Sequence, residues 1–139
     1  LRKGARDAKR RGGLGLIVVD YLQLVTPPDS RISRQQQIGE ITRTLKALSK
    51  ELEGPVLTAS QLRRPQNAKD EPNLTDLRES GDIESDSDVV ILLHTPDEQK
   101  PWALTAYVRK NRAGPRGPVN LFFDTGRGSM NSAERTAAA

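Results

Sequence analysis

Residues 14–24 read L-G-L-I-V-V-D-Y-L-Q-L, and this stretch decides how the rest of the chain is interpreted. Its centre, residues 16–19, is an uninterrupted apolar run that is rich in β-branched side chains and leads directly into Asp20. Such a run predicts a strand buried on both faces. An unpaired carboxylate is costly to bury. We therefore expect Asp20 at the carboxyl end of the strand, where open α/β sheets build their ligand sites.

An apolar strand that ends in Asp has the form of the Walker B element of nucleotide-driven motors. In that element the carboxylate holds Mg²⁺ directly or through water. The same pattern also occurs by chance at the end of many strands, so the interpretation depends on the segments that follow.

The composition limits the class of protein. The chain of 139 residues has the length of about one domain, and it starts at Leu1, so we expect a piece of a longer chain. The absence of Cys excludes disulfides and thiolate metal sites and suits a cytoplasmic protein. No run approaches the roughly 18 apolar residues of a membrane span, and no secretory signal is present, so we expect no membrane partner.

The positive charge is concentrated at the start of the chain. The formal net charge is +4, whereas residues 1–11 alone carry +5, so the remainder sums to −1. A solvated basic helix face is the commoner explanation of such a stretch, and a nucleic-acid contact is the alternative.

The first half of the chain predicts two helices and a second strand. Residues 1–11 form a helix that ends at a Gly pair, and residues 33–52 form a longer one. Ser33 and Gln36 fit a capping box at its start, and Gly54 is expected to end it. An apolar stripe with spacings of three and four residues runs along it: Ile38, Ile41, Leu45, Leu48 and Leu52. Gly39 inside this helix costs roughly 1 kcal/mol relative to Ala.

The second half predicts a loop, a third strand and a hairpin. Residues 62–73 are polar and lack periodicity, and residues 75–80 suit a single helical turn that Gly81 breaks. Residues 89–93 suit a third buried strand. Residues 102–108 and 119–123 suit an antiparallel hairpin, and the pattern is lost from Asp124 onward. This order predicts an α/β fold whose sheet has a parallel part and an antiparallel edge.

Three polar groups outside the first strand are candidates for binding phosphate. Residues 55–59 suit the second strand. Gln61 follows it, where it either hydrogen-bonds a terminal phosphate beside Asp20 or simply meets solvent. Residues 76–84 either present backbone N–H groups and Arg78 to a phosphate or form a solvated acidic turn. Lys110 and Arg112 stand two residues apart on a strand, so they either point together at a triphosphate or decorate an exposed hairpin for solubility.

A carboxylate cluster is a further alternative. If the segment is a strand, alternate residues share one face and could bind a metal ion; these residues are Asp82, Glu84, Asp86 and Asp88. The only His, His94, is expected to be a hydrogen-bonding residue at the end of a strand and is assigned no catalytic role.

Taken together, the segments resemble the RecA-like motor domain of bacterial replicative DNA helicases of the DnaB type. The resemblance covers most of residues 2–123 and keeps the family's order. It rests on five stretches: G-L-G-L-I-V-V-D-Y-L-Q-L at 13–24, S-R-Q-Q-Q-I-G-E-I-T-R-T-L-K-A-L-S-K-E-L at 33–52, S-Q-L at 60–62, D-L-R-E-S-G-D-I-E-S-D-S-D-V-V at 76–90 and K-N-R-A-G-P at 110–115.

The resemblance implies a homohexameric ring that uses ATP and Mg²⁺ to move along single-stranded DNA, with primase and a helicase loader as partners. It implies that Asp20 is the Mg²⁺ ligand and that Gln61 senses the γ-phosphate. It also implies that Lys110 and Arg112 reach the ATP of a neighbouring subunit, Arg112 as the arginine finger.

The resemblance also implies a DNA-contacting loop in the central channel of the ring. Arg78, Glu79 and Gly81 fall on that loop. Arg63 departs from the small or polar residue usual at its position, so its charge either adds a phosphate contact or is merely exposed. Arg109 and Ala113 also depart from the commonest pattern.

Two parts of the family's ATPase site are missing from the sequence. No G-x-x-x-x-G-K-[ST] stretch occurs, and the catalytic Glu of an earlier strand is absent. We therefore expect a partial RecA-like sheet over residues 1–123, without its P-loop strand, and a poorly patterned tail over residues 124–139. Residues 1–139 alone are predicted to be inactive. The alternatives are another RecA-like ATPase and a truncated, non-catalytic subunit of helicase rings.

Overall fold

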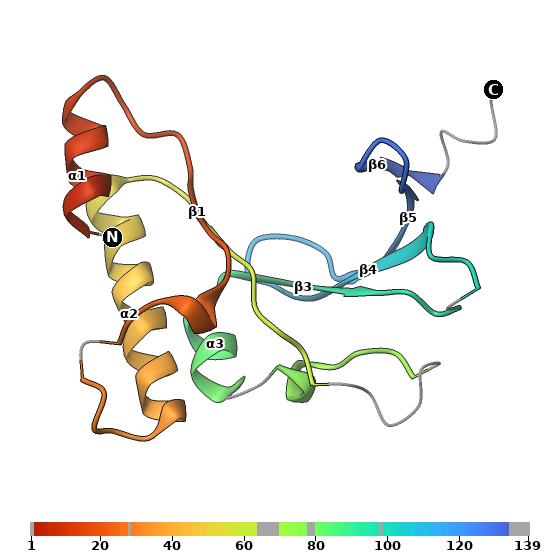
Figure 1. The fold of residues 1–139 in the computed structure, drawn as a ribbon, viewed down its shortest axis with the longest axis horizontal. Coiled ribbons are helices and arrows are strands. Elements are labelled where there is room, and N and C mark those ends of the chain that lie inside the picture. The colour runs from red at the N-terminus through yellow and green to blue at the C-terminus, as the bar shows by residue number, and fades with distance from the viewer. Residues whose placement is uncertain (1, 28, 64–69, 78–79, 98, 134–139) are drawn as a thin grey trace. The chain divides into compact units, whose positions relative to one another are not determined.

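A computed structural model of the chain describes residues 2–27, 29–63, 70–77, 80–97 and 99–133. The chain folds into two compact units, coloured by residue number in Figure 1. The first unit consists of Leu1–Leu62 and Leu77–Ser87, and the second of Arg63–Asp76 and Asp88–Ala139.

The first unit is built on two short parallel strands. Strand β1 (Ile17–Val19) pairs with β2 (Val56–Thr58), and Ile17 lies opposite Val56. Helix α1 (Arg2–Arg10) precedes β1, and a 3₁₀ turn, η1 (Leu22–Leu24), follows it. The long helix α2 (Arg34–Leu52) connects the two strands, which is the order that a parallel pair requires.

Helix α2 supplies most of the core of this unit. Its apolar stripe is buried as the sequence predicts, over Ile38, Ile41, Leu45, Leu48 and Leu52. The predicted capping box is confirmed: the Ser33 hydroxyl accepts from the backbone N–H of Gln36 at 3.3 Å, and the Ser33 N–H donates to the Gln36 side chain at 3.1 Å.

The end of α2 differs from the prediction. The residue in the left-handed conformation is Glu53, with φ of 48°, rather than Gly54. The N–H of Glu53 donates to the oxygen of Lys50, and that of Gly54 donates to the oxygen of Ser49. The two bonds close the last turn one residue before Gly54. Glu53 therefore adopts the left-handed backbone conformation, which is less favourable for a residue with a Cβ than for glycine.

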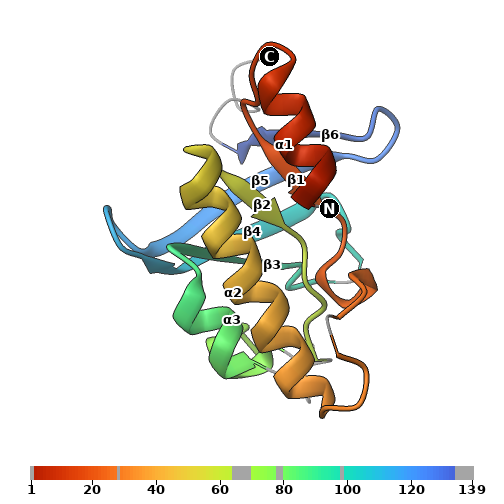
Figure 2. The same ribbon diagram turned by 90° about the vertical axis from the view of Figure 1, so that its left-hand side faces the viewer.

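A third helix, α3 (Ser80–Asp86), packs against α2, as Figure 2 shows. The sequence predicted a turn over residues 75–80 that Gly81 breaks, and this prediction was wrong. A short 3₁₀ turn, η2 (Leu74–Asp76), comes first, and Gly81 lies in the first turn of α3. The backbone freedom of glycine is costly mainly in the interior of a helix, and Gly81 lies near the end of α3 instead.

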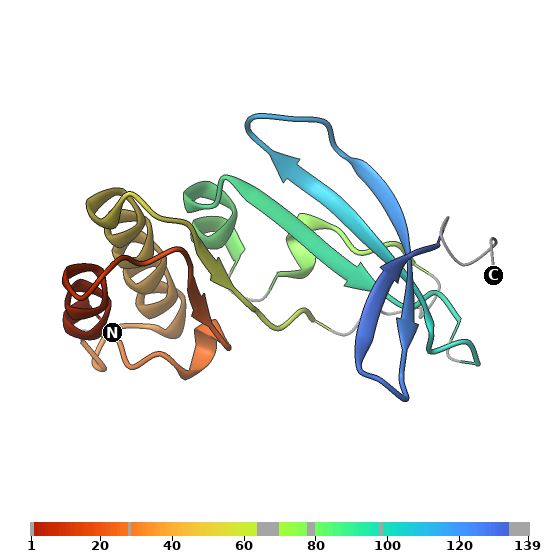
Figure 3. The same ribbon diagram turned by 90° about the horizontal axis from the view of Figure 1, so that it is seen from above.

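The second unit is an antiparallel sheet, seen from above in Figure 3. Its strand order is β3 (Val89–His94), β4 (Ala103–Asn111), β5 (Gly117–Asp124) and β6 (Ser129–Ser132). The predicted hairpin is confirmed by the pairing of β4 with β5. Strand β6 was not expected, because residues 124–139 show no apolar periodicity; its four residues pair with the end of β5 and all four are exposed.

The strands are covered less completely than their apolar runs predict. The side chain of Val18 in β1 is 60% exposed and that of Leu57 in β2 is 59% exposed, while Ile17 and Val19 are buried. Strand β3 alternates in the same way, with Val90 and Leu92 buried. The prediction of strands buried on both faces was wrong, because one face of each strand has no covering element among the described residues.

The mixture of parallel and antiparallel strands confirms the predicted α/β class. Over the described ranges, strands β1 and β2 form one sheet and strands β3–β6 form another. The expectation that the sheet lacks its P-loop strand stays a prediction. In the part of the chain that the structure describes, no helix has the length and apolar character needed to span a membrane.

Candidate functional site

The carboxyl ends of β1 and β2 form one edge of the parallel pair. Asp20 is exposed directly after β1, and Gln61 is exposed three residues after β2. Backbone bonds join the two chain segments beyond the strands: the N–H of Ala59 donates to the oxygen of Val19 at 3.0 Å, and that of Leu22 donates to the oxygen of Ala59 at 2.9 Å. The carboxyl ends of β1 and β2 therefore lie side by side, and the joint role of Asp20 and Gln61 at this edge stays a prediction.

A side chain that the sequence interpretation missed joins the same two segments. The Gln23 amide donates to the Ser60 hydroxyl at 3.0 Å, so the turn after β1 is tied to the residue before Gln61. Arg34, at the start of α2, donates to the backbone oxygen of Gln23 at 2.7 Å. The signal was present in the sequence, because a polar Gln23 interrupts the apolar residues that follow Asp20.

This edge fits Mg²⁺ only in part. An exposed carboxylate such as Asp20 suits Mg²⁺, which keeps several waters and is usually bound by one or two carboxylates together with substrate phosphates. Within the described ranges, no three His, Cys, Asp or Glu side chains gather where they could hold a metal ion by themselves. Asp20 would thus hold Mg²⁺ in company with the phosphates of a bound nucleotide.

The predicted carboxylate cluster does not form. Asp82, Glu84 and Asp86 lie on α3, so they do not share the face of a strand. Asp86 accepts from the Thr42 hydroxyl at 2.6 Å, and Asp82 lies 3.8 Å from the guanidinium of Arg43. These carboxylates fasten α3 to α2, and the metal-binding alternative was wrong in its geometry.

The second unit carries the two candidate cations at the end of β4. Lys110 lies opposite Val90 and is partly exposed. Arg112 lies one residue beyond the strand rather than on it, and the expectation that its side chain and that of Lys110 point the same way stays a prediction. The backbone N–H of Arg112 donates to the oxygen of Asp88 at 3.0 Å, and its guanidinium donates to the Asp88 carboxylate at 3.2 Å. The sequence predicted Asp88 only as a member of the carboxylate cluster, not as a partner of Arg112.

Asn111 shapes the loop that contains Arg112. Its side-chain oxygen accepts from the N–H of Ala113 at 3.2 Å, and its amide donates to the oxygen of Pro115 at 3.1 Å. A Cβ on Gly114 would lie 2.8 Å from the Asn111 amide nitrogen, which is too close, so this position accepts only glycine without a shift. Asn111 and Gly114 explain why this K-N-R-A-G-P loop turns so tightly.

The candidate DNA-contacting residues are spread over both units. Arg63 is exposed in the second unit, and its N–H donates to the backbone oxygen of Asp76 at 2.7 Å. Gly81 is exposed in α3 of the first unit. Arg78 and Glu79 lie outside the described residues.

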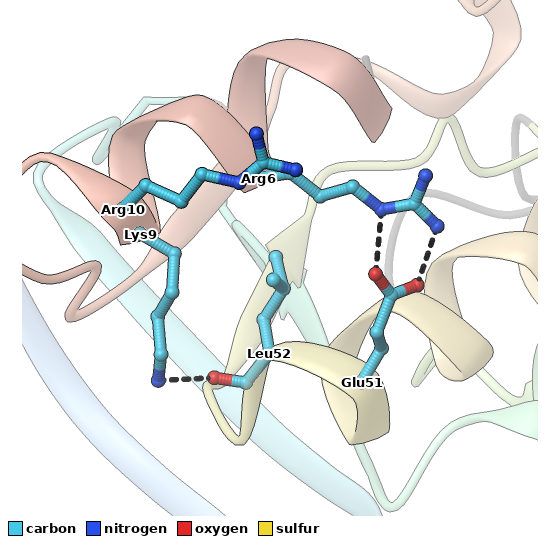
Figure 4. A pocket seen from close by; sticks show the side chains of 5 residues that line it. All are labelled: Arg6, Lys9, Arg10, Glu51 and Leu52. Atoms are coloured by element: carbon cyan, nitrogen blue, oxygen red, sulfur yellow. Dashed lines mark hydrogen bonds and ion pairs between the residues drawn. The ribbon is translucent and has the colours of Figure 1, made fainter.

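A shallow pocket between α1 and α2 is lined mainly by charged side chains of these two helices (Figure 4). Arg6 of α1 donates to both carboxylate oxygens of Glu51 of α2, at 2.5 and 2.9 Å, and Lys9 donates to the backbone oxygen of Leu52 at 2.7 Å. Figure 4 shows both cations reaching from α1 to the end of α2. The hydrogen bonds and charge of Arg6 hold the pKa of Glu51 below its usual range. The pocket is a helix contact rather than a ligand site.

Comparison with known proteins identifies the family. The model of the family described as "DnaB-like helicase C terminal domain" matches residues 1–131. The chain belongs to the DnaB-like helicase C-terminal domain family. Relatives in this family include the replicative DNA helicase DnaB of Leifsonia xyli, 44% identical over 130 residues, and that of Geobacillus stearothermophilus, 42% identical over 131 residues. The matching segment of the Mycobacterium intracellulare DnaB is 50% identical over 128 residues.

The chain spans under a third of the length of these relatives. Each match covers 87–88% of this chain, but only 28% of the Leifsonia protein, 29% of the Geobacillus protein and 22% of the Mycobacterium protein. The segment that the family model matches, residues 1–131, contains every candidate residue named above.

Solved structures of related proteins share the fold. One is a DnaB-like replicative helicase described with its interactions with primase; it superposes with a TM-score of 0.85 at 34% identity, over 93% of this chain and 34% of that one. Another is a separately solved ATPase domain, with a TM-score of 0.86 at 34% identity, over 94% of this chain and 49% of that one. The fold is therefore that of part of a DnaB-type ATPase domain.

Proposed function

We propose that this chain acts as part of a hexameric, ATP-dependent replicative DNA helicase that moves along single-stranded DNA and unwinds duplex at the replication fork. The parallel pairing of β1 with β2 supports this function most strongly, because it brings Asp20 and Gln61 to one edge. Membership of the DnaB-like family supports ATP and Mg²⁺ as the ligands of that edge. Single-stranded DNA, further copies of the chain, primase and a helicase loader are the proposed partners, in the cytoplasm.

The ATP site is shared between two subunits. When bound, ATP with Mg²⁺ supplies the phosphoryl group and neutralises charge on its phosphates. Asp20 holds the Mg²⁺ ion, and the Gln61 amide hydrogen-bonds the γ-phosphate and reports its presence. Lys110 and Arg112 of the neighbouring subunit donate to the phosphates, and the Arg112 guanidinium stabilises the charge that develops during transfer.

Single-stranded DNA is held through its phosphates. Arg63 and Arg78 supply positive charge, and Glu79 and Gly81 are the other proposed contacts. Such contacts follow the backbone and carry no sequence preference, which suits a motor that passes along any sequence.

Complementation between two inactive variants tests the shared site. ATP hydrolysis is measured for the full-length protein that carries residues 1–139, as Arg112→Ala, as Asp20→Ala and as an equal mixture. Each variant alone is expected to lose nearly all activity. The mixture is expected to regain about a quarter of the wild-type rate, because random mixing leaves that share of interfaces with an intact Asp20 facing an intact Arg112.

Arg116→Ala is the matched control, because Arg116 is an exposed arginine in the same loop. It is expected to hydrolyse ATP at the wild-type rate. If Arg112→Ala is also fully active while it remains oligomeric, the shared site is wrong. Residues 1–139 expressed alone are expected to show no hydrolysis, since the chain has no P-loop.

A further inference from the structure

Arg109 makes three contacts within the second unit that the proposed ATP site does not use. Its Nε donates to the backbone oxygen of Pro72 at 2.8 Å, and its Nη2 donates to the carboxylate of Glu71 at 2.9 Å. Its guanidinium carbon lies 4.5 Å from the centre of the Tyr107 ring, in a cation–π arrangement. All three contacts act on one planar group.

These contacts fix the Arg109 side chain more firmly than an ion pair would. An exposed pair such as Arg109 with Glu71 has little value by itself, because water competes for both charges. The Arg109 side chain is only 26% exposed, and it rests on the buried ring of Tyr107. Burial and the charge of Glu71 raise the pKa of the Tyr107 hydroxyl, so that group stays neutral beneath the guanidinium.

The segment that Arg109 holds is itself folded. The N–H of Asn73 donates to the Asp76 carboxylate at 2.7 Å, and the N–H of Asp76 donates to the oxygen of Asn73 at 3.0 Å. The oxygen of Asp76 in turn accepts from the N–H of Arg63. Residues 71–76 thus form a small closed turn that lies between Arg63 and Arg78 in the chain, the two proposed DNA-contacting cations.

The other end of the connection is strand β4. Arg109 is followed by Lys110 and, after Asn111, by Arg112. Displacement of the Arg109 backbone therefore moves the proposed trans-acting cations, because the three residues belong to one strand and the turn directly after it.

We propose that Arg109 is a positioning residue that couples residues 71–76, the turn bonded to the backbone of Arg63, to the strand carrying the trans-acting cations, so that bound single-stranded DNA accelerates ATP hydrolysis. This inference rests on the proposed function. The contact acts in both directions: DNA bound at Arg63 that fixes the position of residues 71–76 also fixes the position of β4 near Lys110 and Arg112. Arg109 itself touches neither DNA nor ATP.

The test measures ATP hydrolysis by the full-length protein over a range of concentrations of an oligo(dT) strand. Arg109→Ala is expected to keep the DNA-free rate and to lose about threefold to tenfold in stimulation by DNA. Arg109→Lys retains the charge opposite Glu71 but not the planar group, so it is expected to recover the stimulation only in part. Arg116→Ala is the matched control and is expected to behave as wild type.

Hydrogen exchange provides a second measurement that does not depend on activity. The N–H groups of Asn73 and Asp76 are expected to exchange faster in Arg109→Ala, while those of α1 are unchanged. Full stimulation by DNA in Arg109→Ala overturns the inference. An equal loss of the DNA-free and DNA-stimulated rates also overturns it, because such a loss indicates that Arg109 has only a structural role. A wild-type protein that hydrolyses no ATP, or that ignores DNA, contradicts the proposed function instead.

Discussion

Arg112 and Asp88 are joined twice, through the backbone at 3.0 Å and through their side chains at 3.2 Å. Arg112 lies just beyond β4 and Asp88 just before β3, so the pair closes the end of this strand pair. A trans-acting arginine works only when its guanidinium is correctly placed at the moment of transfer. The Asp88 carboxylate is well situated to orient it.

The first prediction concerns this ion pair. Asp88→Asn in the full-length protein is expected to lower the rate of ATP hydrolysis by about threefold to tenfold, because the guanidinium loses its fixed orientation. The melting temperature is expected to change little, since the side chains of Arg112 and Asp88 are 54% and 58% exposed and such pairs contribute little to stability. Steady-state hydrolysis and a thermal melt measure the two effects.

Asp97→Asn is the control for this variant. Asp97 pairs with Lys100 in a loop of the same unit, at 3.7 Å, and neither belongs to the proposed site. Its removal is expected to leave hydrolysis unchanged. Equal losses of activity in Asp88→Asn and Asp97→Asn would show that the Arg112 pair has no special role.

The parts of the fold that the sequence predicts well are those in which a single periodic pattern determines the structure. Helix α2 is one: its apolar stripe and the Ser33 cap agree on where it starts and which face it buries. The parallel pairing of β1 with β2 is another, because the helix between the two apolar runs supplies the crossover that a parallel pair needs.

The parts that failed depend on contacts between distant residues. Helix α3 buries a single apolar side chain, Ile83, so it has no apolar stripe to predict it. Polar contacts such as Thr42 with Asp86 also hold it to α2, and no local pattern in the sequence predicts them. The sequence could not predict the partners of Arg112 and Arg109 either, because these partners are distant in the chain. Asp88 is 24 residues from Arg112 in the chain, and Glu71 is 38 residues from Arg109.

The second prediction concerns Gly39, where α2 and α3 approach closely. A Cβ on Gly39 would overlap the Asp82 carboxylate oxygen and lie 2.8 Å from its Cγ. The overlap in Gly39→Ala is therefore expected to destabilise this helix contact by about 1–3 kcal/mol. The higher helix propensity of Ala offsets roughly 1 kcal/mol of this loss. Hydrogen exchange in α2 and α3 of the full-length protein measures the change.

A double variant tests the reason for this effect. Asp82 also lies 3.8 Å from Arg43, an exposed pair whose loss costs little. Gly39→Ala combined with Asp82→Ala removes the overlap, so it is expected to restore slow exchange in both helices. If the double variant exchanges as fast as Gly39→Ala, the overlap with Asp82 is not the cause.

The third prediction concerns acid pH and the attachment of α1. The structure describes every residue of α1 and buries none of them, so polar contacts dominate its attachment to α2, chiefly the Arg6–Glu51 ion pair and the bond from Lys9 to Leu52. Arg6 lowers the pKa of Glu51 below 4.5 in the folded state. A depressed carboxylate pKa contributes stability that is fully present above the unfolded pKa and is lost as pH falls through the folded pKa.

Lowering the pH from neutral to below 4.5 is therefore expected to release α1 while α2 stays protected. Hydrogen exchange, corrected for the intrinsic effect of pH, is expected to show about twofold to fivefold faster exchange in α1 at the acid end. Glu51→Gln cannot titrate at this position, so its α1 is expected to exchange faster at neutral pH and to show no further change with acid. An acid-dependent rise of equal size in Glu51→Gln would assign the transition to a group other than Glu51.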